Sequence, residues 1–246
     1  LVVSLDQLQA QLPNVEEVTL VVSWFGDDLR CGACAIRPKV EQAAKTTIPF
    51  EWRVNGVDRA HAAVVSQHGD GPAYGGTPAD QAVLQAIAEL KRRGLRVARY
   101  LFVLMDVPAG NALPDPYGGP AQGAYPWRGR ITCHPAAGRP GSPDKTSAAT
   151  AQVAAFFGAA TAAQFGAADG LPTYGGPPGD WGLRRMLLHY AKLAQLAGGV
   201  DGFILGSELR GLTTVRDGVS SYPAVTALKA LAGQVRTLLG PATKLG

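Results

Sequence analysis

Three apolar runs of this sequence lead into carboxylates. The stretch Val200–Gly211 passes from apolar residues through Gly206 and Ser207 to Glu208, Leu95–Met105 is followed by Asp106, and Val18–Phe25 by Gly26 and Asp27. A carboxyl group shielded by apolar walls has a raised pKa and can donate a proton to a leaving oxygen. Glu208, bracketed by glycines, is the leading candidate for such a general acid.

Glycoside hydrolysis is the chemistry that such carboxyl groups most directly indicate. It usually needs two of them, about 5 Å apart for retention or about 6.5–9.5 Å apart for inversion. Asp106 is the best internal partner for Glu208, with Asp27 or Asp28 behind it, and the partner could equally lie beyond Gly246. The alternative for Glu208 is a salt bridge to Arg210 or a neighbouring arginine.

Aromatic and basic residues near the predicted strand ends could hold a sugar. Large aromatic faces stack on the apolar faces of sugar rings, although a role in the core or in anchoring a loop is more common for any one residue. Arg128 and Arg130 could clamp an anionic group, or pair with nearby acids. The candidate binding residues are Trp24, Asp27, Tyr74, Trp127, Arg128 and Arg210, with Tyr125 and Tyr174 as further aromatics.

No cofactor or metal is predicted. Cys31 and Cys34 form a lone C-x-x-C, to which Cys133 and His134 could add zinc ligands, but loop or half-buried thiols with one bridge at most are favoured. His189 falls in a predicted helix and is expected to pack there. The sequence also lacks a glycine-rich phosphate loop and a G-x-S-x-G serine elbow, which argues against an open-sheet nucleotide enzyme.

Composition fits one large α/β domain. The chain has 246 residues, 46% of them hydrophobic, and its net charge of +4 is spread along the sequence rather than gathered in one run. Direct nucleic-acid binding is therefore not expected. No apolar stretch approaches the ~20 residues that span a bilayer, and the first residues lack the features of a signal peptide.

Strand and helix patterns alternate along the chain, which is typical of parallel βα units. A strand over 18–25 is followed by an accessory hairpin near 50–66, in which 60–66 is either the returning strand or a second barrel strand. Thr77 is expected to cap a helix that ends near Gly94. A long Pro/Gly-rich loop should then cover the mouth near 106–146. The remaining predicted elements are a strand over 95–105, helices over 147–165, 181–197 and 223–239, the strand leading to Glu208, and an incipient strand at 243–246.

These elements indicate about four strands of a (β/α)₈ TIM-barrel-like domain plus the start of a fifth. In such barrels the catalytic groups lie at the carboxyl ends of the strands. Because a closed barrel needs eight strands, we expect residues 1–246 to be roughly the N-terminal half of a barrel within a longer polypeptide. An open doubly wound sheet is the alternative.

Several long and unusual stretches resemble the TIM-barrel-like domain of gene transfer agent and phage tail host-specificity proteins. They include Val22–Leu29, Ala73–Pro78, Met105–Asn111, Tyr125–Cys133 and Gly206–Gly211. The resemblance implies a tail-tip or baseplate (hub) component of a phage-like particle, assembled in the bacterial cytoplasm and released. Its partners would be other tail proteins, further copies of itself, and bacterial surface glycan or peptidoglycan.

The resemblance also implies roles for residues. In similar hydrolase barrels a glutamate ending the fourth strand is the acid/base, which corresponds to Glu208, and the nucleophile ends the seventh strand. The usual Asn-Glu pair is Ser207-Glu208 here, which departs from the pattern at the residue that handles the sugar 2-hydroxyl. The domain is thus either a glycoside hydrolase or a structural, glycan-binding module without catalysis.

Overall fold

A computed structural model describes all residues, 1–246. Its main sheet has the order β13-β12-β9-β1-β2. The strands β1 (Glu17–Gly26), β9 (Arg96–Met105), β12 (Gly202–Ile204) and β13 (Lys244–Leu245) are parallel, and β2 (Ile36–Arg37) runs antiparallel to β1. Parallel strands that are neighbours both in space and in the chain are what a barrel requires, but this sheet is open, with β2 and β13 as its edges.

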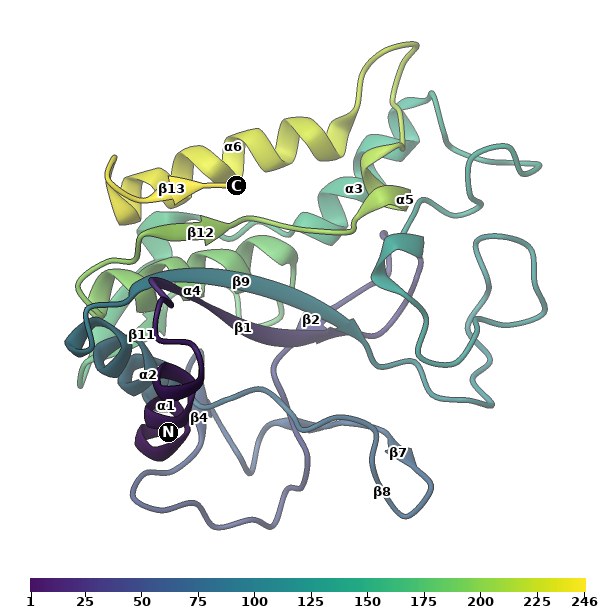
Figure 1. Cartoon of the computed structure of the whole chain (residues 1–246). Helices are drawn as coiled ribbons and strands as arrows, with labels where there is room; N and C mark the ends of the chain where they lie inside the picture. Colours follow the sequence, from purple (N-terminus) through teal and green to yellow (C-terminus); the bar gives the residue numbers. More distant parts are fainter.

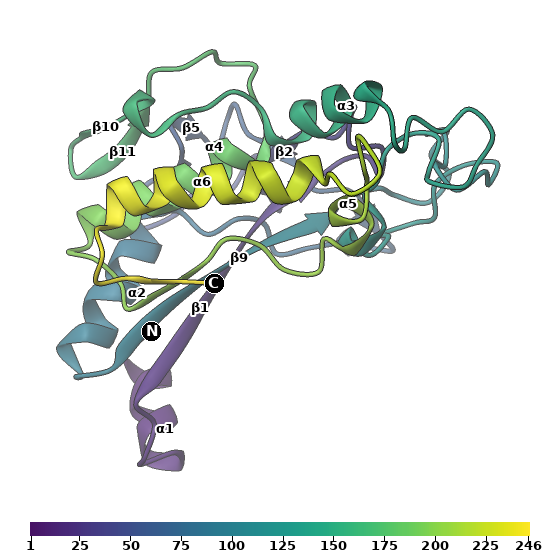
Figure 2. The same ribbon diagram turned by 90° about the horizontal axis from the view of Figure 1, so that it is seen from above.

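Helices connect the parallel strands and pack along the sheet (Figures 1 and 2). The connection from β1 to β9 contains α2, that from β9 to β12 contains α3 and α4, and that from β12 to β13 contains α5 and α6. The α4 helix contacts α2, α3 and α6. The helices span Val2–Gln11 (α1), Asp80–Arg92 (α2), Ser147–Phe157 (α3), Leu183–Leu196 (α4), Arg210–Thr213 (α5) and Pro223–Leu239 (α6). None of them is both long and apolar enough to cross a bilayer.

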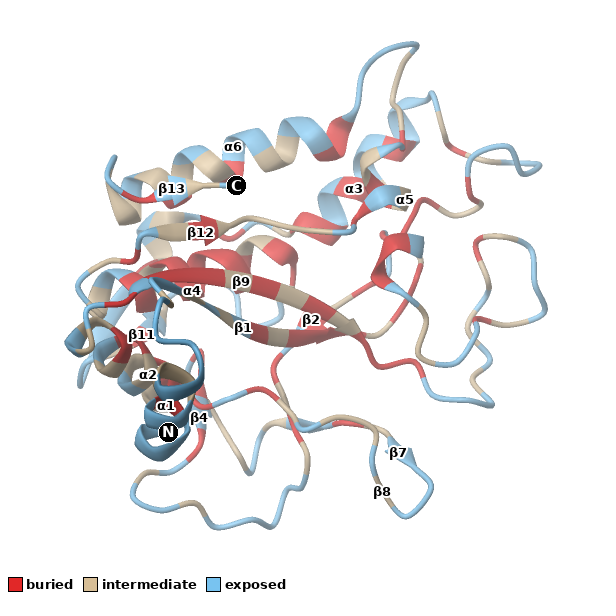
Figure 3. Cartoon of the chain, viewed as in Figure 1, coloured by how far each residue is buried: buried red, intermediate tan, exposed pale blue.

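The two faces of the sheet are covered unequally. On one face Trp24 and Phe203 are completely buried, and the Trp24 indole Nε1 donates to the Tyr190 hydroxyl of α4 at 3.1 Å. The other face carries Val21, which is 58% exposed, and its register partner Tyr100. Buried residues therefore gather along β9 and α4, as Figure 3 shows, and one face of β1 stays open.

The predicted strand count is wrong by one. Residues 60–66 do not form a strand of the main sheet: β6 (Ala63–Val64) pairs only with β3 (Lys39–Val40), in a separate two-stranded sheet. Both β6 residues are exposed, so the segment lacks the burial that a barrel strand requires. The sheet thus holds three full parallel strands and the two-residue β13, and Glu208 follows the third strand rather than the fourth.

The accessory hairpin is shorter than expected. It pairs β4 (Arg53–Val54) with β5 (Val57–Asp58) across Asn55 and Gly56, both of which have positive φ. This two-residue turn brings the chain straight back, so the returning strand begins at Val57. A further small ribbon pairs β7 (Gln67–His68) with β8 (Gly71–Pro72).

The predicted helix over 147–165 also ends early. The α3 helix stops at Gly158, whose φ of +71° ends the helical conformation. A short 3₁₀ turn (η2, Ala162–Gln164) and a hairpin of β10 (Phe165–Ala168) and β11 (Leu171–Tyr174) follow. Its turn residues Asp169 and Gly170 both have positive φ, as a type I′ turn requires.

The start of α2 differs from the sequence prediction as well. Ala79, not Thr77, occupies the N-cap position, and the Thr77 hydroxyl instead donates to the Ser23 carbonyl at 2.8 Å. Asp80 is buried and accepts from the His189 Nε2 at 2.8 Å. The interpretation of His189 as a packed helix residue is confirmed, because its side chain is completely buried.

The long loop after β9 is confirmed as irregular over 106–146, apart from the 3₁₀ turn η1 (Arg128–Arg130). It extends beyond the carboxyl ends of the strands (Figure 1). Gln122, which is 4% exposed, anchors it: its side chain donates to Asp28 at 2.7 Å and accepts from the Leu29 amide at 2.9 Å. The loop is therefore fixed to the end of β1.

Candidate functional site

Glu208 lies four residues beyond β12, where the chain turns into α5. Its φ is +56°, a left-handed conformation that is uncommon for a residue other than glycine. The side chain is 48% exposed. Such strained positions are frequent at functional sites, so the backbone itself draws attention to this residue.

Two residues of the mouth loop hold the Glu208 carboxylate. The Trp127 indole Nε1 donates to Oε2 at 2.5 Å, and the Arg128 Nη2 lies 3.1 Å from the same oxygen. The structure thus brings together three predicted site residues, Glu208, Trp127 and Arg128, from segments about eighty positions apart. The predicted alternative of an arginine salt bridge is also realised, with Arg128 rather than Arg210.

Arg128 is buried, with only 5% of its side chain exposed. Its Nε donates to the Ser207 carbonyl at 3.2 Å, and its Nη2 to the Ser207 hydroxyl at 3.1 Å. The guanidinium carbon lies 3.4 Å from the centre of the Phe102 ring, and Nη2 also donates to the Tyr100 hydroxyl at 3.3 Å. Arg128 therefore links β9 to the segment that carries Glu208.

Sequence reasoning missed Tyr100 and Phe102 as parts of this site, whereas it had noted Ser207 as the residue that replaces the usual asparagine. The alternation of β9 could have shown that Tyr100 and Phe102 share the face of Asp106, because side chains two apart lie on one side of a strand. The Ser207 hydroxyl is also hydrogen-bonded to the Tyr100 hydroxyl. It is thus committed to protein partners.

Trp127 is the exposed aromatic of the site, with 49% of its surface accessible. A Cβ added to Gly129 would meet the indole ring at 2.4 Å, so glycine is what allows the ring to approach the backbone. One part of the indole is thus supported while another part faces solvent. An exposed, supported ring of this kind can stack on a sugar.

A groove of about 570 Å³ opens beside Glu208. Its walls combine leucines with polar residues of α5 and α6, and Arg210 lies at its edge with an exposed side chain. The lining residues are Leu205, Gly206, Ser207, Glu208, Leu209, Arg210, Thr213, Leu228, Lys229, Ala232 and Gly246. The groove therefore joins a carboxylate, two cations and apolar surface.

Asp106 lies at the end of β9 in a different environment. It is 5% exposed, and its Oδ2 lies 2.7 Å from the Lys39 Nζ. Its Oδ1 accepts from the Ser66 hydroxyl at 2.5 Å. Asp106 and Glu208 thus have separate hydrogen-bonding partners, Lys39 and Ser66 for Asp106, Trp127 and Arg128 for Glu208.

Asp27 and Asp28, at the end of β1, are perturbed in opposite directions. Burial raises the pKa of Asp27 and outweighs the hydrogen bond from the Ala35 amide, which lowers it. Burial also opposes ionisation of Asp28, but hydrogen bonds from Arg30 and Gln122 outweigh it and lower the pKa of that carboxyl. Neither aspartate contacts Glu208 through any hydrogen bond or ion pair.

Two of the aromatic residues predicted to bind sugar, Trp24 and Tyr74, make their contacts elsewhere than with Glu208. Trp24 is completely buried against Tyr190, so its prediction as a substrate-binding residue is wrong: the strand alternation turns it toward the helices. Tyr74 is half-buried and donates to the Met105 carbonyl at 3.1 Å. Its ring packs edge-on against Tyr125, with 5.8 Å between the centres. Tyr74 thus belongs to the Asp106 end of the sheet.

The cysteines form neither a bridge nor a metal centre. Cys31, Cys34 and Cys133 are all free and buried, and burial raises the pKa of Cys31 and of Cys34 to about 12. Nowhere do three His, Cys, Asp or Glu side chains gather as a metal site would require. Thiols of this kind are unreactive packing groups.

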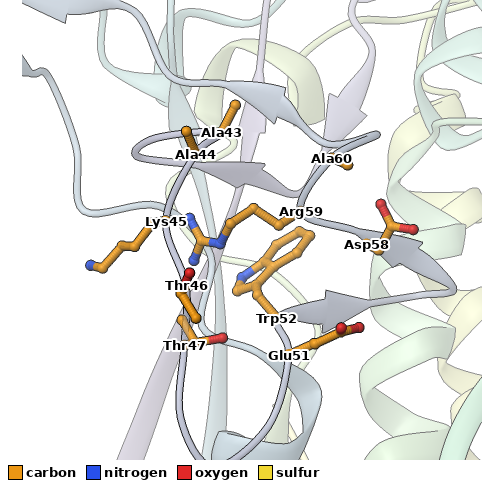
Figure 4. A pocket seen from close by; sticks show the side chains of 10 residues that line it. All are labelled: Ala43, Ala44, Lys45, Thr46, Thr47, Glu51, Trp52, Asp58, Arg59 and Ala60. Atoms are coloured by element: carbon orange, nitrogen blue, oxygen red, sulfur yellow. The ribbon is translucent and has the colours of Figure 1, made fainter.

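A second cavity, of about 530 Å³, lies within the 43–60 segment (Figure 4). Its main side chains are already engaged: the Arg59 Nη1 donates to the Gln42 carbonyl at 2.7 Å, and the Trp52 Nε1 to the Thr77 carbonyl at 2.6 Å. Trp52 is also only 4% exposed, so its ring is not available for stacking. The groove beside Glu208 is therefore the better candidate for a ligand-binding site.

The fold is a mixed α/β arrangement of parallel βα units with carboxylates beyond their strand ends, in an open sheet. Residues 181–246 match the family model of the GTA TIM-barrel-like domain. This match supports, for that part of the chain, the resemblance to a gene transfer agent TIM-barrel-like domain. It includes Glu208 and Arg210, whereas Trp127, Arg128 and Asp106 lie outside it. No curated protein matches the chain.

Proposed function

We propose that this protein is a tail-tip or baseplate (hub) component of a gene transfer agent or phage-like particle, and that its Glu208 site contacts host envelope glycan. The observation that carries the proposal is the half-exposed Trp127 indole, hydrogen-bonded to Glu208 beside an open groove. An aromatic surface next to a carboxylate acceptor suits the two sides of a sugar, its apolar face and its hydroxyl groups.

Binding without cleavage is the form of this function that the contacts favour. Glu208 is held in an ion pair with Arg128, and Asp106 is committed to Lys39 and Ser66. Ser207, which stands where related hydrolases have asparagine, is occupied by Tyr100 and Arg128. Both predicted catalytic carboxylates are thus held in ion pairs within the protein, which favours binding over proton transfer.

Hydrolysis is the second candidate, and the left-handed backbone of Glu208 favours it. A strained conformation that places a carboxylate at a strand end is typical of catalytic residues. In this case Glu208 acts as the proton donor, and the second carboxylate is either Asp106 after a rearrangement or a residue outside this chain.

The test is a binding assay with purified host envelope polysaccharide and peptidoglycan, together with a reducing-sugar assay. Trp127→Ala should weaken binding about tenfold, as loss of one stacking platform does. Tyr222→Ala is a matched control, because Tyr222 is an exposed aromatic (40%) in the loop before α6. Unchanged binding in Trp127→Ala would refute the glycan site.

The reducing-sugar assay separates the two candidates. Release of sugar that disappears in Glu208→Gln, with binding retained, would establish a hydrolase and overturn the binding-only form. Absence of release together with Glu208-dependent binding supports a glycan-binding module.

The open sheet face supports the further proposal that the sheet is part of a (β/α)₈ barrel, within an oligomeric tail component. Val21, on that face, would then point to the barrel interior. A Val21→Cys variant tests this in the intact particle: protection from a thiol reagent is expected, and rapid labelling would contradict it. The native cysteines are all buried and give the background. Cryo-electron microscopy of the particle would test the tail-tip location.

A further inference from the structure

The groove beside Glu208 carries two cations that lack acidic partners. Neither Arg210, on α5, nor Lys229, on α6, has a carboxylate within 4.0 Å, and neither side chain makes a hydrogen bond. Some exposed arginines are paired, such as Arg92 with Glu89 and Arg96 with Glu16 and Glu17, whereas Arg139 is exposed without an acidic partner. The groove therefore stands out because two unpaired cations, Arg210 and Lys229, line the same cavity.

The only acidic side chain of the groove is already neutralised. Glu208 shares its Oε2 with the buried Arg128, at 3.1 Å. Its charge therefore offsets that of Arg128, and Arg210 and Lys229 remain as a net excess of positive charge in the groove. A ligand that enters here meets two cations and no free carboxylate side chain.

The walls bring these cations onto one ligand-sized surface. On α6, Leu228 and Ala232 are four residues apart and share one face, with Lys229 beside them. On α5, Arg210 and Thr213 are three apart and face the same groove. Both cations are exposed, so their attraction for an anion should weaken as the salt concentration rises.

We infer that this groove binds an anionic substituent, a carboxylate or a phosphate, of the glycan whose ring contacts Trp127. The protein therefore selects acidic over neutral envelope sugars. This inference rests on the proposed glycan-binding function and adds to it the class of sugar. Lys229 becomes a specificity-determining residue that sequence reasoning did not single out, alongside the predicted binding residue Arg210.

The experiment compares three probes of equal length on the full chain by calorimetry: a neutral galactose tetramer, a galacturonic acid tetramer, and a mannose tetramer ending in a 6-phosphate. We expect the acidic probes to bind about tenfold more tightly at low salt than the neutral one, and this preference to shrink toward 0.5 M salt. Comparison of the two acidic probes distinguishes carboxylate from phosphate.

The double variant Arg210→Glu, Lys229→Glu should abolish the preference for acidic probes, because it replaces both cations of the groove with carboxylates. Arg139→Glu, in the exposed part of the mouth loop, is the matched control and should retain the preference. Both groove residues are exposed, so the double variant is expected to fold, which circular dichroism checks.

Equal affinity for all three probes, still reduced by Trp127→Ala, would overturn the inference and leave the glycan site standing. A preference for acidic probes that persists in the double variant would place the anion elsewhere and also overturn it. Absence of binding to every probe and to envelope polysaccharide would overturn both.

Discussion

The ends of β9 and β12 carry the same kind of group in opposite settings. At the end of β9, Asp106 is 5% exposed and shared between Lys39 and Ser66. At the end of β12, Glu208 is half-exposed, bent into a left-handed conformation and adjacent to a groove of about 570 Å³. Position at a strand end is therefore not sufficient for a site. What differs is whether the surrounding loops bury the carboxylate and supply all its partners, or leave it accessible to a ligand.

The loops explain this difference. The segment between β1 and α2 folds back over the end of β9 and supplies Lys39 and Ser66 to Asp106. At Glu208 the mouth loop supplies Trp127 and Arg128 from one side only. Variants at the two ends should therefore affect stability at one and binding at the other.

The largest effect is expected for Asp106→Ala. This change leaves the Lys39 ammonium and the Ser66 hydroxyl without their carboxylate, and removing one member of a buried ion pair costs about 3–5 kcal/mol of unfolding free energy. Urea unfolding measures the loss. Asp70→Ala, at an exposed residue without an ion-pair partner, is the control. A loss no larger than in the control would contradict a stabilising role for Asp106.

Arg128→Ala should have the next largest effect, a loss of about 2–3 kcal/mol of unfolding free energy. The change removes a buried guanidinium that binds Ser207, Tyr100 and Glu208 and covers Phe102. Arg130→Ala, two residues along and exposed, should cost much less. If the two variants unfold at the same urea concentration, Arg128 does not tie the mouth loop to β9.

Asp27 and Asp28, at the carboxyl end of β1, should give opposite dependences of the unfolding free energy on pH. Hydrogen bonds outweigh burial and depress the folded pKa of Asp28, so it stabilises the fold above the unfolded value near 3.8 and this contribution disappears as pH falls through its folded pKa. Asp28→Asn should thus cost about 1.5 kcal/mol at neutral pH and less below about pH 4.

Asp27→Asn should show the opposite trend. Burial raises the folded pKa of Asp27 above the unfolded value of 3.8. The wild type therefore loses stability relative to the variant as pH rises from 3.8 through the folded pKa. Urea unfolding between about pH 3 and pH 7 measures both variants. If the unfolding free energies of the two variants changed with pH in the same way, the opposite pKa shifts of Asp27 and Asp28 would be contradicted.

The smallest effect on stability is expected for Glu208→Gln, less than about 1 kcal/mol, because its ion pair is half-exposed. Glu208→Gly should be at least as stable as Glu208→Gln, since glycine adopts a φ of +56° without strain. Both should reduce glycan binding. A loss as large as that of Asp106→Ala would erase the contrast between the two strand ends.

Much of the fold was predictable because the signals are local. The apolar runs of β1 and β9 and the spacing of apolar residues in α2, α4 and α6 predicted those elements within a few residues. The errors fell where tertiary packing decides. Residues 60–66 have the composition of a strand, but the chain places them at the surface, beside β3. Trp24 has the composition of a sugar platform, but the pleat turns it into the core.

The site followed the same division. The sequence by itself determined that carboxylates follow the strands, because an apolar run followed by a polar residue is a local pattern. Only the tertiary structure decided which carboxylate stays available. That choice depends on Lys39, Ser66, Trp127 and Arg128, which reach the strand ends from loops distant in the chain. Hydrogen bonds and burial at such distances are set by packing, which no local pattern records.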